Sequence, residues 1–174
     1  MIRVIVVVAL ASFIGQAAAT KSRVDYSGVW QLEDPSAEAL DIGGMTGGGN
    51  FMTIRQDAEQ IAIDRMYARA ALKFVVRLDG RDSVNIDQLH MPSASVDLIS
   101  HVTWAGSSLI IETDRIHTDR NGKVTRQKTR ETLSLDAGKL VIVRTETLAA
   151  RAPVTSKRIY VRKPAGVLKE GPGV

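Results

Sequence analysis

Apolar and polar residues alternate with a period of two through most of this chain. The clearest case lies at residues 72–78, where one face would carry Leu72, Phe74, Val76 and Leu78. Lys73 and Arg77 would then point to the opposite face, because successive side chains of a strand alternate sides. The pattern predicts strands with one buried face and one face in water, which is typical of antiparallel sheets.

The same alternation recurs between turn signals such as Asp79-Gly80 and Asn121-Gly122, which accept positive φ at low cost. Further apolar pairs that would share a face are Trp30 and Leu32, Met52 and Ile54, Ile61 and Ile63, Val96 and Leu98, Val102 and Trp104, Leu109 and Ile111, Leu133 and Leu135, Leu140 and Ile142, and Ile159 and Val161. One short helical candidate lies at Ser36–Leu40. The sequence therefore predicts an all-β domain, a single antiparallel up-and-down meander of about eight to ten strands closed into a barrel.

The first residues have the features of a secretory signal peptide. Arg3 precedes an apolar run from Val4 to Ile14, and Ala17-Ala18-Ala19 supplies the small residues that signal peptidase requires. An apolar run of this length is shorter than the roughly 20 residues that span a bilayer, so we expect cleavage rather than anchoring. We expect an exported protein, periplasmic or secreted, with a leader at 1–19, a barrel at 20–163 and a flexible tail at 164–174.

Composition limits how such a domain is stabilised and what it binds. The chain has no cysteine, so neither a disulfide nor acylation of a cysteine is available. Cleavage after residue 19 would remove one of the 23 basic residues and lower the formal charge from +4 to +3. That modest charge, without an aromatic-rich basic patch, argues against a nucleic-acid partner. The few aromatic residues also argue against a membrane barrel, which needs two aromatic girdles. We expect no membrane-spanning segment in the mature chain.

Several short motifs resemble those of small exported bacterial proteins with lipocalin-like (calycin-type) barrels, whose domain opens with a Gly-x-Trp strand. The matching stretches are Gly28-Val29-Trp30, Gly43–Gly49, Met52-Thr53-Ile54, Leu78-Asp79-Gly80, Trp104–Thr113 and Leu133–Val143. The resemblance covers most of the chain after the leader, although each motif is only a strand and a turn. The chain departs from the pattern at Asp136-Ala137-Gly138, which stands where the group has Asp-Gly.

The resemblance implies a ligand cup and an arginine from the last strand packed across the opening Trp30. Arg158 and Arg162 are the candidates, yet both lie opposite Ile159 and Val161, the residues that alternation turns inward. Either the last strand therefore has the other register, or the contact is missing. The residues expected to line the cavity or its mouth are Trp30, Phe74, Trp104, Gly47 and Gly48.

No catalytic, metal or cofactor motif stands out, so we expect neither an enzyme nor a cofactor. His101 would lie opposite Glu112 and near Asp114 on the wet face, where a histidine and a carboxylate could form a general base. His117 with Asp114 and Asp119 could gather a metal, although the spacing is not that of a calcium loop. For both histidines, an ordinary polar surface is the favoured interpretation.

Alternating cations at Arg126, Lys128 and Arg130 could line the barrel and attract an anionic ligand. Glu131 and Leu133 set the inward side of that strand, which favours a solvated outer stripe instead. The expected function is therefore an exported, soluble carrier of a small, partly apolar or anionic ligand. The alternatives are an envelope interaction module with a filled barrel and, less favoured, a barrel enzyme using His101 or His117. The ligand and the oligomeric state are left open by the sequence.

Overall fold

The computed structural model of the protein describes residues 23–34, 50–67, 70–86, 95–148 and 151–164. The leader, the short helical candidate, the glycine-rich segment with Gly47 and Gly48, and nearly all of the expected tail lie outside these residues. The described elements are the strands β1 (Gly28–Leu32), β2 (Phe51–Gln56), β3 (Gln60–Tyr67), β4 (Ala70–Arg77), β5 (Ser83–Ile86), β6 (Ser95–Ala105), β7 (Ser108–Thr118), β8 (Val124–Asp136), β9 (Lys139–Leu148) and β10 (Val154–Lys163). None of the helices in the described residues has the length and apolarity of a membrane-spanning segment.

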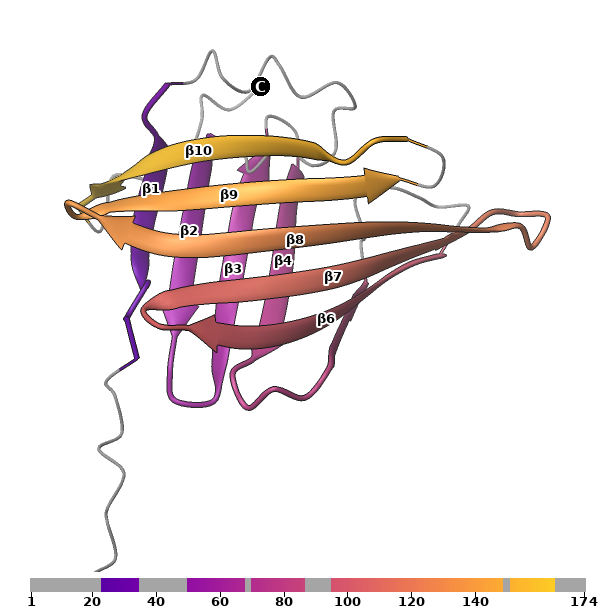
Figure 1. The fold of residues 1–174 in the computed structure, drawn as a ribbon, viewed down its shortest axis with the longest axis horizontal. Helices are drawn as coiled ribbons and strands as arrows, with labels where there is room; N and C mark the ends of the chain where they lie inside the picture. Colours follow the sequence, from indigo (N-terminus) through magenta and orange to yellow (C-terminus); the bar gives the residue numbers. More distant parts are fainter. Residues whose placement is uncertain (1–22, 35–49, 68–69, 87–94, 149–150, 165–174) are drawn as a thin grey trace, which may run out of the picture.

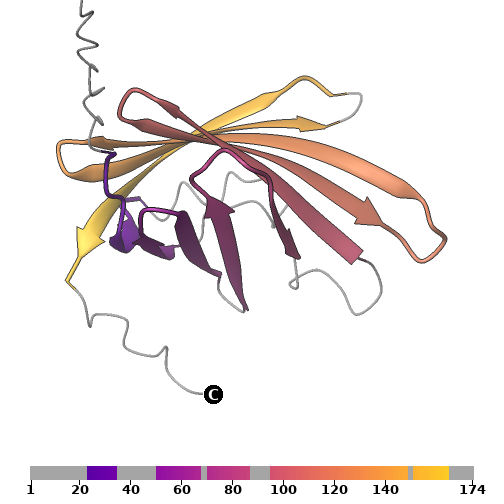
Figure 2. The same ribbon diagram turned by 90° about the horizontal axis from the view of Figure 1, so that it is seen from below.

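All ten strands belong to one antiparallel sheet, in the order β4-β3-β2-β1-β10-β9-β8-β7-β6-β5. Each strand pairs with its neighbour in the chain, except that β1 also pairs with β10 and β4 does not join the ladder of β5. Figure 1 shows β1 to β4 crossing the long strands β6 to β10, and Figure 2 shows the two groups stacked as two faces of one curved sheet. The predicted up-and-down meander is confirmed as a nearly closed ten-stranded barrel.

Side chains at alternate positions of each strand fill the space between the two groups. The buried core contains Tyr26, Trp30, Leu32, Met52, Ile54, Ile61, Ile63, Phe74, Val76, Leu78, Val96, Leu98, Val102, Leu109, Ile111, Leu133, Leu140, Ile142 and Tyr160. Lys73 and Arg77 are exposed, as the alternation predicts, while Leu72 is half-buried. Full burial of each large apolar side chain stabilises the fold by about 1.5–3 kcal/mol, so this core replaces the disulfides that the chain lacks.

The gap between β4 and β5 is bridged by side chains rather than by a backbone ladder. The Val75 amide donates to Asn85 Oδ1 at 2.9 Å, and Asn85 Nδ2 donates to the Val75 carbonyl at 2.8 Å. Close by, the Arg77 amide donates to Ser83 Oγ at 2.8 Å. The carboxamide of Asn85 thus acts as a substitute peptide group, which satisfies edge groups of β4 that would otherwise lack partners.

The expected orientation of the last strand is wrong. Arg158 and Tyr160 are buried, whereas Ile159 and Val161 face outward and are half-buried. The inward face gains the aromatic ring of Tyr160, which buries more apolar area than either aliphatic residue. The charge of Arg158 is tolerated there because Glu131 lines the same small cavity.

Candidate functional site

One end of the barrel is closed by aromatic residues from the segment before β1. The Tyr26 hydroxyl lies 2.8 Å from the carbonyl oxygens of both Ser107 and Leu133, so its single proton is shared between two strand ends. The Trp30 indole N–H donates to the Tyr26 carbonyl at 3.0 Å. The Tyr26 ring also stacks on Trp104, with the centroids 6.3 Å apart. We call this group of residues the closed end.

Arg162 crosses Trp30 at the closed end, with its guanidinium carbon 4.7 Å from the ring centroid. The contact implied by the resemblance is therefore present, and Arg162 rather than Arg158 forms it. Gly28 lies beneath this contact with a φ of 147°, a backbone conformation that favours glycine, and a Cβ there would only touch Arg162 Cζ, at 3.4 Å. A cation stacked over an indole ring is attracted by the negative face of the ring.

Farther along the interior, buried charges form a network that we call the inner charge cluster, made of Arg65, Glu131, Arg144, Glu146 and Arg158. Arg65 Nη2 lies 2.7 Å from Glu131 Oε2, and Arg144 Nη1 lies 3.2 Å from Glu131 Oε1. Arg144 Nε also donates to Glu146 Oε1 at 2.7 Å. Arg65, Glu131 and Arg158 are each less than a tenth exposed, so water screens them poorly.

A cavity of about 10 Å³ lies within the cluster, close to the volume that a single buried water needs. Its lining contains three arginines and one glutamate, together with the Tyr160 hydroxyl, Ser156 and Ile142. The Tyr160 hydroxyl is buried, and it forms no hydrogen bond of good geometry with any described residue. The cavity is therefore a cationic niche in which the Tyr160 hydroxyl lies beside Arg158.

The charges set the ionisation states inside the barrel. Burial by itself would raise the pKa of Glu131, but the attraction of Arg65 and Arg144 outweighs it and lowers that pKa to about 2. Burial raises the pKa of Tyr160, so the phenol stays protonated and able to donate. At neutral pH the niche is lined by an ionised carboxylate, three guanidinium groups and a neutral phenol.

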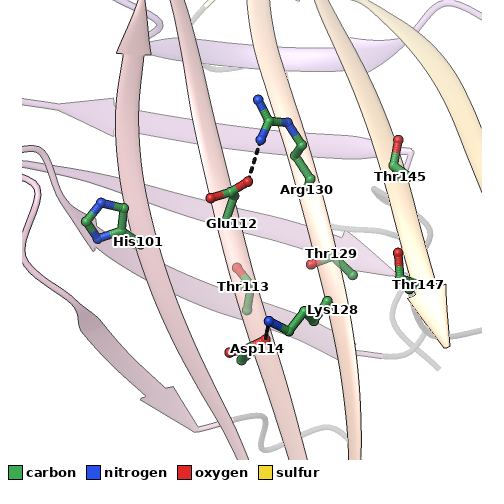
Figure 3. Close-up of a pocket in the computed structure, with 9 residues that line it drawn as sticks. All are labelled: His101, Glu112, Thr113, Asp114, Lys128, Thr129, Arg130, Thr145 and Thr147. Atoms are coloured by element: carbon green, nitrogen blue, oxygen red, sulfur yellow. Dashed lines mark hydrogen bonds and ion pairs between the residues drawn. The ribbon is translucent and has the colours of Figure 1, made fainter. Parts of the chain in front are cut away.

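A shallow depression of about 430 Å³ lies on the outer face of β6 to β9 (Figure 3). Glu112 pairs with Arg130 across it, and Lys128 Nζ lies 3.7 Å from Asp114 Oδ1. These cross-strand pairs confirm that the stripe containing Arg126 and Lys128 is solvated rather than internal. The depression is lined by paired charges and threonines, which is typical of an outer sheet surface.

The structure places the two candidate histidines at exposed or half-buried positions. His101 does lie opposite Glu112 in the register, yet its Nδ1 contacts Asp82 Oδ1 at 3.2 Å, and both side chains are exposed. His117 is half-buried near the end of β7, and Asp114 lies on the other face of that strand, beside Lys128. Within the residues that the structure covers, no three histidine or acidic side chains are grouped as a metal site.

The predicted cavity residues lie apart from the niche. Trp30 and Phe74 are packed in the core, Trp104 is partly buried at the closed end, and Gly47 and Gly48 are outside the described residues. Sequence reasoning missed the inner charge cluster, although a signal was present. Arg65 shares its side of β3 with Ile61 and Ile63, and Arg144 shares its side of β9 with Leu140 and Ile142. Charged residues in phase with apolar ones mark an interior charge.

Comparison with known proteins adds no identification. No protein-family model matches the sequence, and no curated protein matches it significantly. The architecture is compatible with a lipocalin-like fold, and function must be argued from the barrel and its inner charge cluster.

Proposed function

We propose that this protein is an exported, lipocalin-like carrier that binds a small amphipathic ligand through an anionic head group. The observation that carries the proposal is the cationic niche, where three arginines and the Tyr160 hydroxyl face one glutamate. Including Glu146, the niche and its immediate partners carry three guanidinium groups against two carboxylates. A bound anionic group would balance this excess of positive charge.

The chemistry of the niche favours a carboxylate or a phosphate over a neutral head group. Guanidinium groups donate forked hydrogen bonds that match the oxygens of these anions. The Tyr160 hydroxyl supplies a further donor from the same strand as Arg158. In a site with little water, such charge-assisted bonds are about twice as strong as neutral ones.

The surroundings of the niche fit the apolar part of a ligand. On the side away from the closed end, the inner faces of β7 to β9 carry half-buried side chains, among them His117, Gln127 and Leu148. Beneath the niche the core is packed with Leu32, Leu140 and other apolar residues. The ligand would thus enter head first, and its chain would remain between the niche and the end opposite the closed end.

Titration calorimetry with laurate and lauryl alcohol tests the proposal, since the two molecules share a chain and differ in the head group. We expect laurate to bind and the alcohol to bind at least tenfold more weakly, because a hydrogen bond to a charged group contributes about 1.5–3 kcal/mol. Arg158→Met should remove the preference for laurate. Arg130→Met, on the outer face, is the matched control and should leave it unchanged. Equal affinities for both molecules would contradict the role of the niche.

Export is a separate part of the proposal and has its own test. The mature N-terminus should lie near Thr20, because Ala17 and Ala19 satisfy signal peptidase. Sequencing the N-terminus of protein recovered outside the cytoplasm checks this. An exported chain that still begins with Met1 would contradict cleavage.

One observation favours a second candidate, an interaction module of the cell envelope with a filled barrel. The cavity inside the charge cluster measures about 10 Å³, far less than the roughly 300–1,000 Å³ of ordinary ligand pockets. A ligand would therefore have to displace side chains or occupy the half-buried region beyond the cluster. If a panel of fatty acids and phosphorylated lipids neither binds nor raises the melting temperature, the interaction module replaces the carrier.

A further inference from the structure

The turn between β7 and β8 forms a projecting tip whose charges differ from those of the barrel wall. We call residues 118–126 the hairpin tip. Within the described residues, the pairing of β8 with β9 ends at Gln127, so Val124, Thr125 and Arg126 pair there with β7 alone. Figure 1 shows the hairpin extending beyond the end of β9. The tip thus projects beyond the described part of β9.

Cations of the hairpin tip lack the acidic partners found nearer the barrel. On the wall, Arg130 pairs with Glu112 and Lys128 lies beside Asp114. At the tip, Arg120, Lys123 and Arg126 are exposed, and no described residue forms an ion pair with them. Among the described residues, these three cations therefore outnumber the acidic side chains of the hairpin tip by three to one.

The single acid of the hairpin tip is occupied by the turn itself. The Asp119 carboxylate accepts hydrogen bonds from the backbone amides of Asn121 at 2.8 Å and Lys123 at 2.9 Å. The backbone closes the same turn, since Asp119 N donates to the Lys123 carbonyl at 3.0 Å. The tip is consequently a defined structure that presents its cations in a fixed arrangement.

An apolar side chain lies among these cations. Val124 is 52% exposed and stands between Lys123 and Arg126 in the sequence. Basic residues around an exposed apolar one suit the surface of an anionic bilayer, where cations meet head groups and the apolar side chain meets the interface. A nucleic-acid strand would instead use aromatic side chains for stacking, and residues 118–126 contain none.

We propose that the hairpin tip docks this protein on membranes that contain anionic phospholipid, through Arg120, Lys123, Arg126 and Val124. The proposal does not depend on ligand binding by the barrel. Each basic residue near an anionic surface contributes about fivefold to binding, so removal of all three should weaken it by about two orders of magnitude.

Vesicle sedimentation tests the proposal, using phosphatidylcholine vesicles with and without phosphatidylglycerol. We expect binding to the anionic vesicles alone, and loss of that binding at about 1 M salt, where the Debye length falls to about 3 Å. The variant Arg120→Gln/Lys123→Gln/Arg126→Gln should bind the anionic vesicles about 100-fold more weakly. The matched control, Arg55→Gln/Lys73→Gln/Lys157→Gln, removes the same charge from exposed positions elsewhere and should keep its affinity. All variants share one N-terminus, so any contribution from that part of the chain is common to them.

A fluorescent side chain at a known position distinguishes docking by the hairpin tip from diffuse electrostatic attraction of the whole protein. Tryptophan introduced as Val124→Trp should shift its emission to the blue on anionic vesicles, because the ring enters the interface. Val84→Trp, at an exposed position of β5, should not shift. Equal losses in the two triple variants, or a shift at both tryptophans, would overturn the proposal. Tight binding of duplex DNA that the tip variant abolishes, with no vesicle binding, would assign the tip to nucleic acid instead.

Discussion

Replacing Glu131 with glutamine tests the inner charge cluster, because Glu131 is the carboxylate that both Arg65 and Arg144 contact. The substitution keeps the volume and one acceptor but removes the negative charge that Arg65 and Arg144 share. Removing one partner of a buried ion pair typically costs about 3–5 kcal/mol. We expect Glu131→Gln to lower the free energy of unfolding by that amount near neutral pH.

The pH dependence supplies an independent estimate of the same interaction. The pKa of Glu131 falls from 4.5 to about 2 in the folded protein. A carboxylate with a depressed folded pKa stabilises the native state above its unfolded pKa, and this stability is lost as the pH falls through the folded value. The change in pKa corresponds to about 3 kcal/mol, present above about pH 4.5 and lost as the pH falls toward 2.

Urea unfolding of the wild type and the variant, at neutral pH and near pH 3, measures both quantities. The difference between the two proteins should shrink as the pH falls, since the other carboxylates contribute equally to both. Glu112→Gln removes an exposed partner of Arg130 and should cost less than about 1 kcal/mol at either pH. If Glu131→Gln is no more destabilising than Glu112→Gln, the Glu131 carboxylate does not stabilise the barrel.

Three further substitutions test the core, the gap between β4 and β5, and a turn by the same unfolding assay. Phe74→Ala should cost about 3–5 kcal/mol, whereas Lys73→Ala should stay within roughly 0.5 kcal/mol, because only the first side chain is buried; similar costs would mean that the strand register is wrong. Asn85→Ala should cost about 1–3 kcal/mol, because it removes both hydrogen bonds to the Val75 backbone. A neutral result would show that other contacts bridge the gap between β4 and β5. Ala137→Gly should stabilise the protein by up to about 1 kcal/mol, because Ala137 has a φ of 48°, which glycine adopts without strain; a loss of stability would contradict that turn geometry.

Period-two alternation was sufficient to predict the fold class, because it requires no knowledge of distant contacts. The register of β6 and β7 followed from the four-residue turn, and His101 does lie opposite Glu112. Alternation did not predict which face of the last strand is buried, because both faces carry residues that can be buried. Ile159 and Val161 are aliphatic, but Arg158 and Tyr160 occupy the interior, where both line the same cavity as Glu131.

The inner charge cluster shows why a site is harder to predict than a fold. Its members come from four strands: Arg65 from β3, Glu131 from β8, Arg144 and Glu146 from β9, and Arg158 from β10. Arg65, Glu131 and Arg144 are in phase with apolar residues of their own strands, which predicts that they point inward but not which charges they meet. Glu131 and Arg144 are register partners on adjacent strands, but Arg65 meets Glu131 only because the curved sheet brings β3 over β8.

The most direct test of the central claim is a nuclear magnetic resonance measurement of laurate labelled with ¹³C at its carboxyl carbon, bound to the protein. If the head group lies in the niche, the bound signal should show contacts to the ring protons of Tyr160. Its carboxyl pKa should also lie well below that of laurate in water, because Arg65, Arg144 and Arg158 favour the anion. A bound carboxylate that titrates as it does in water, without a contact to Tyr160, would contradict the account.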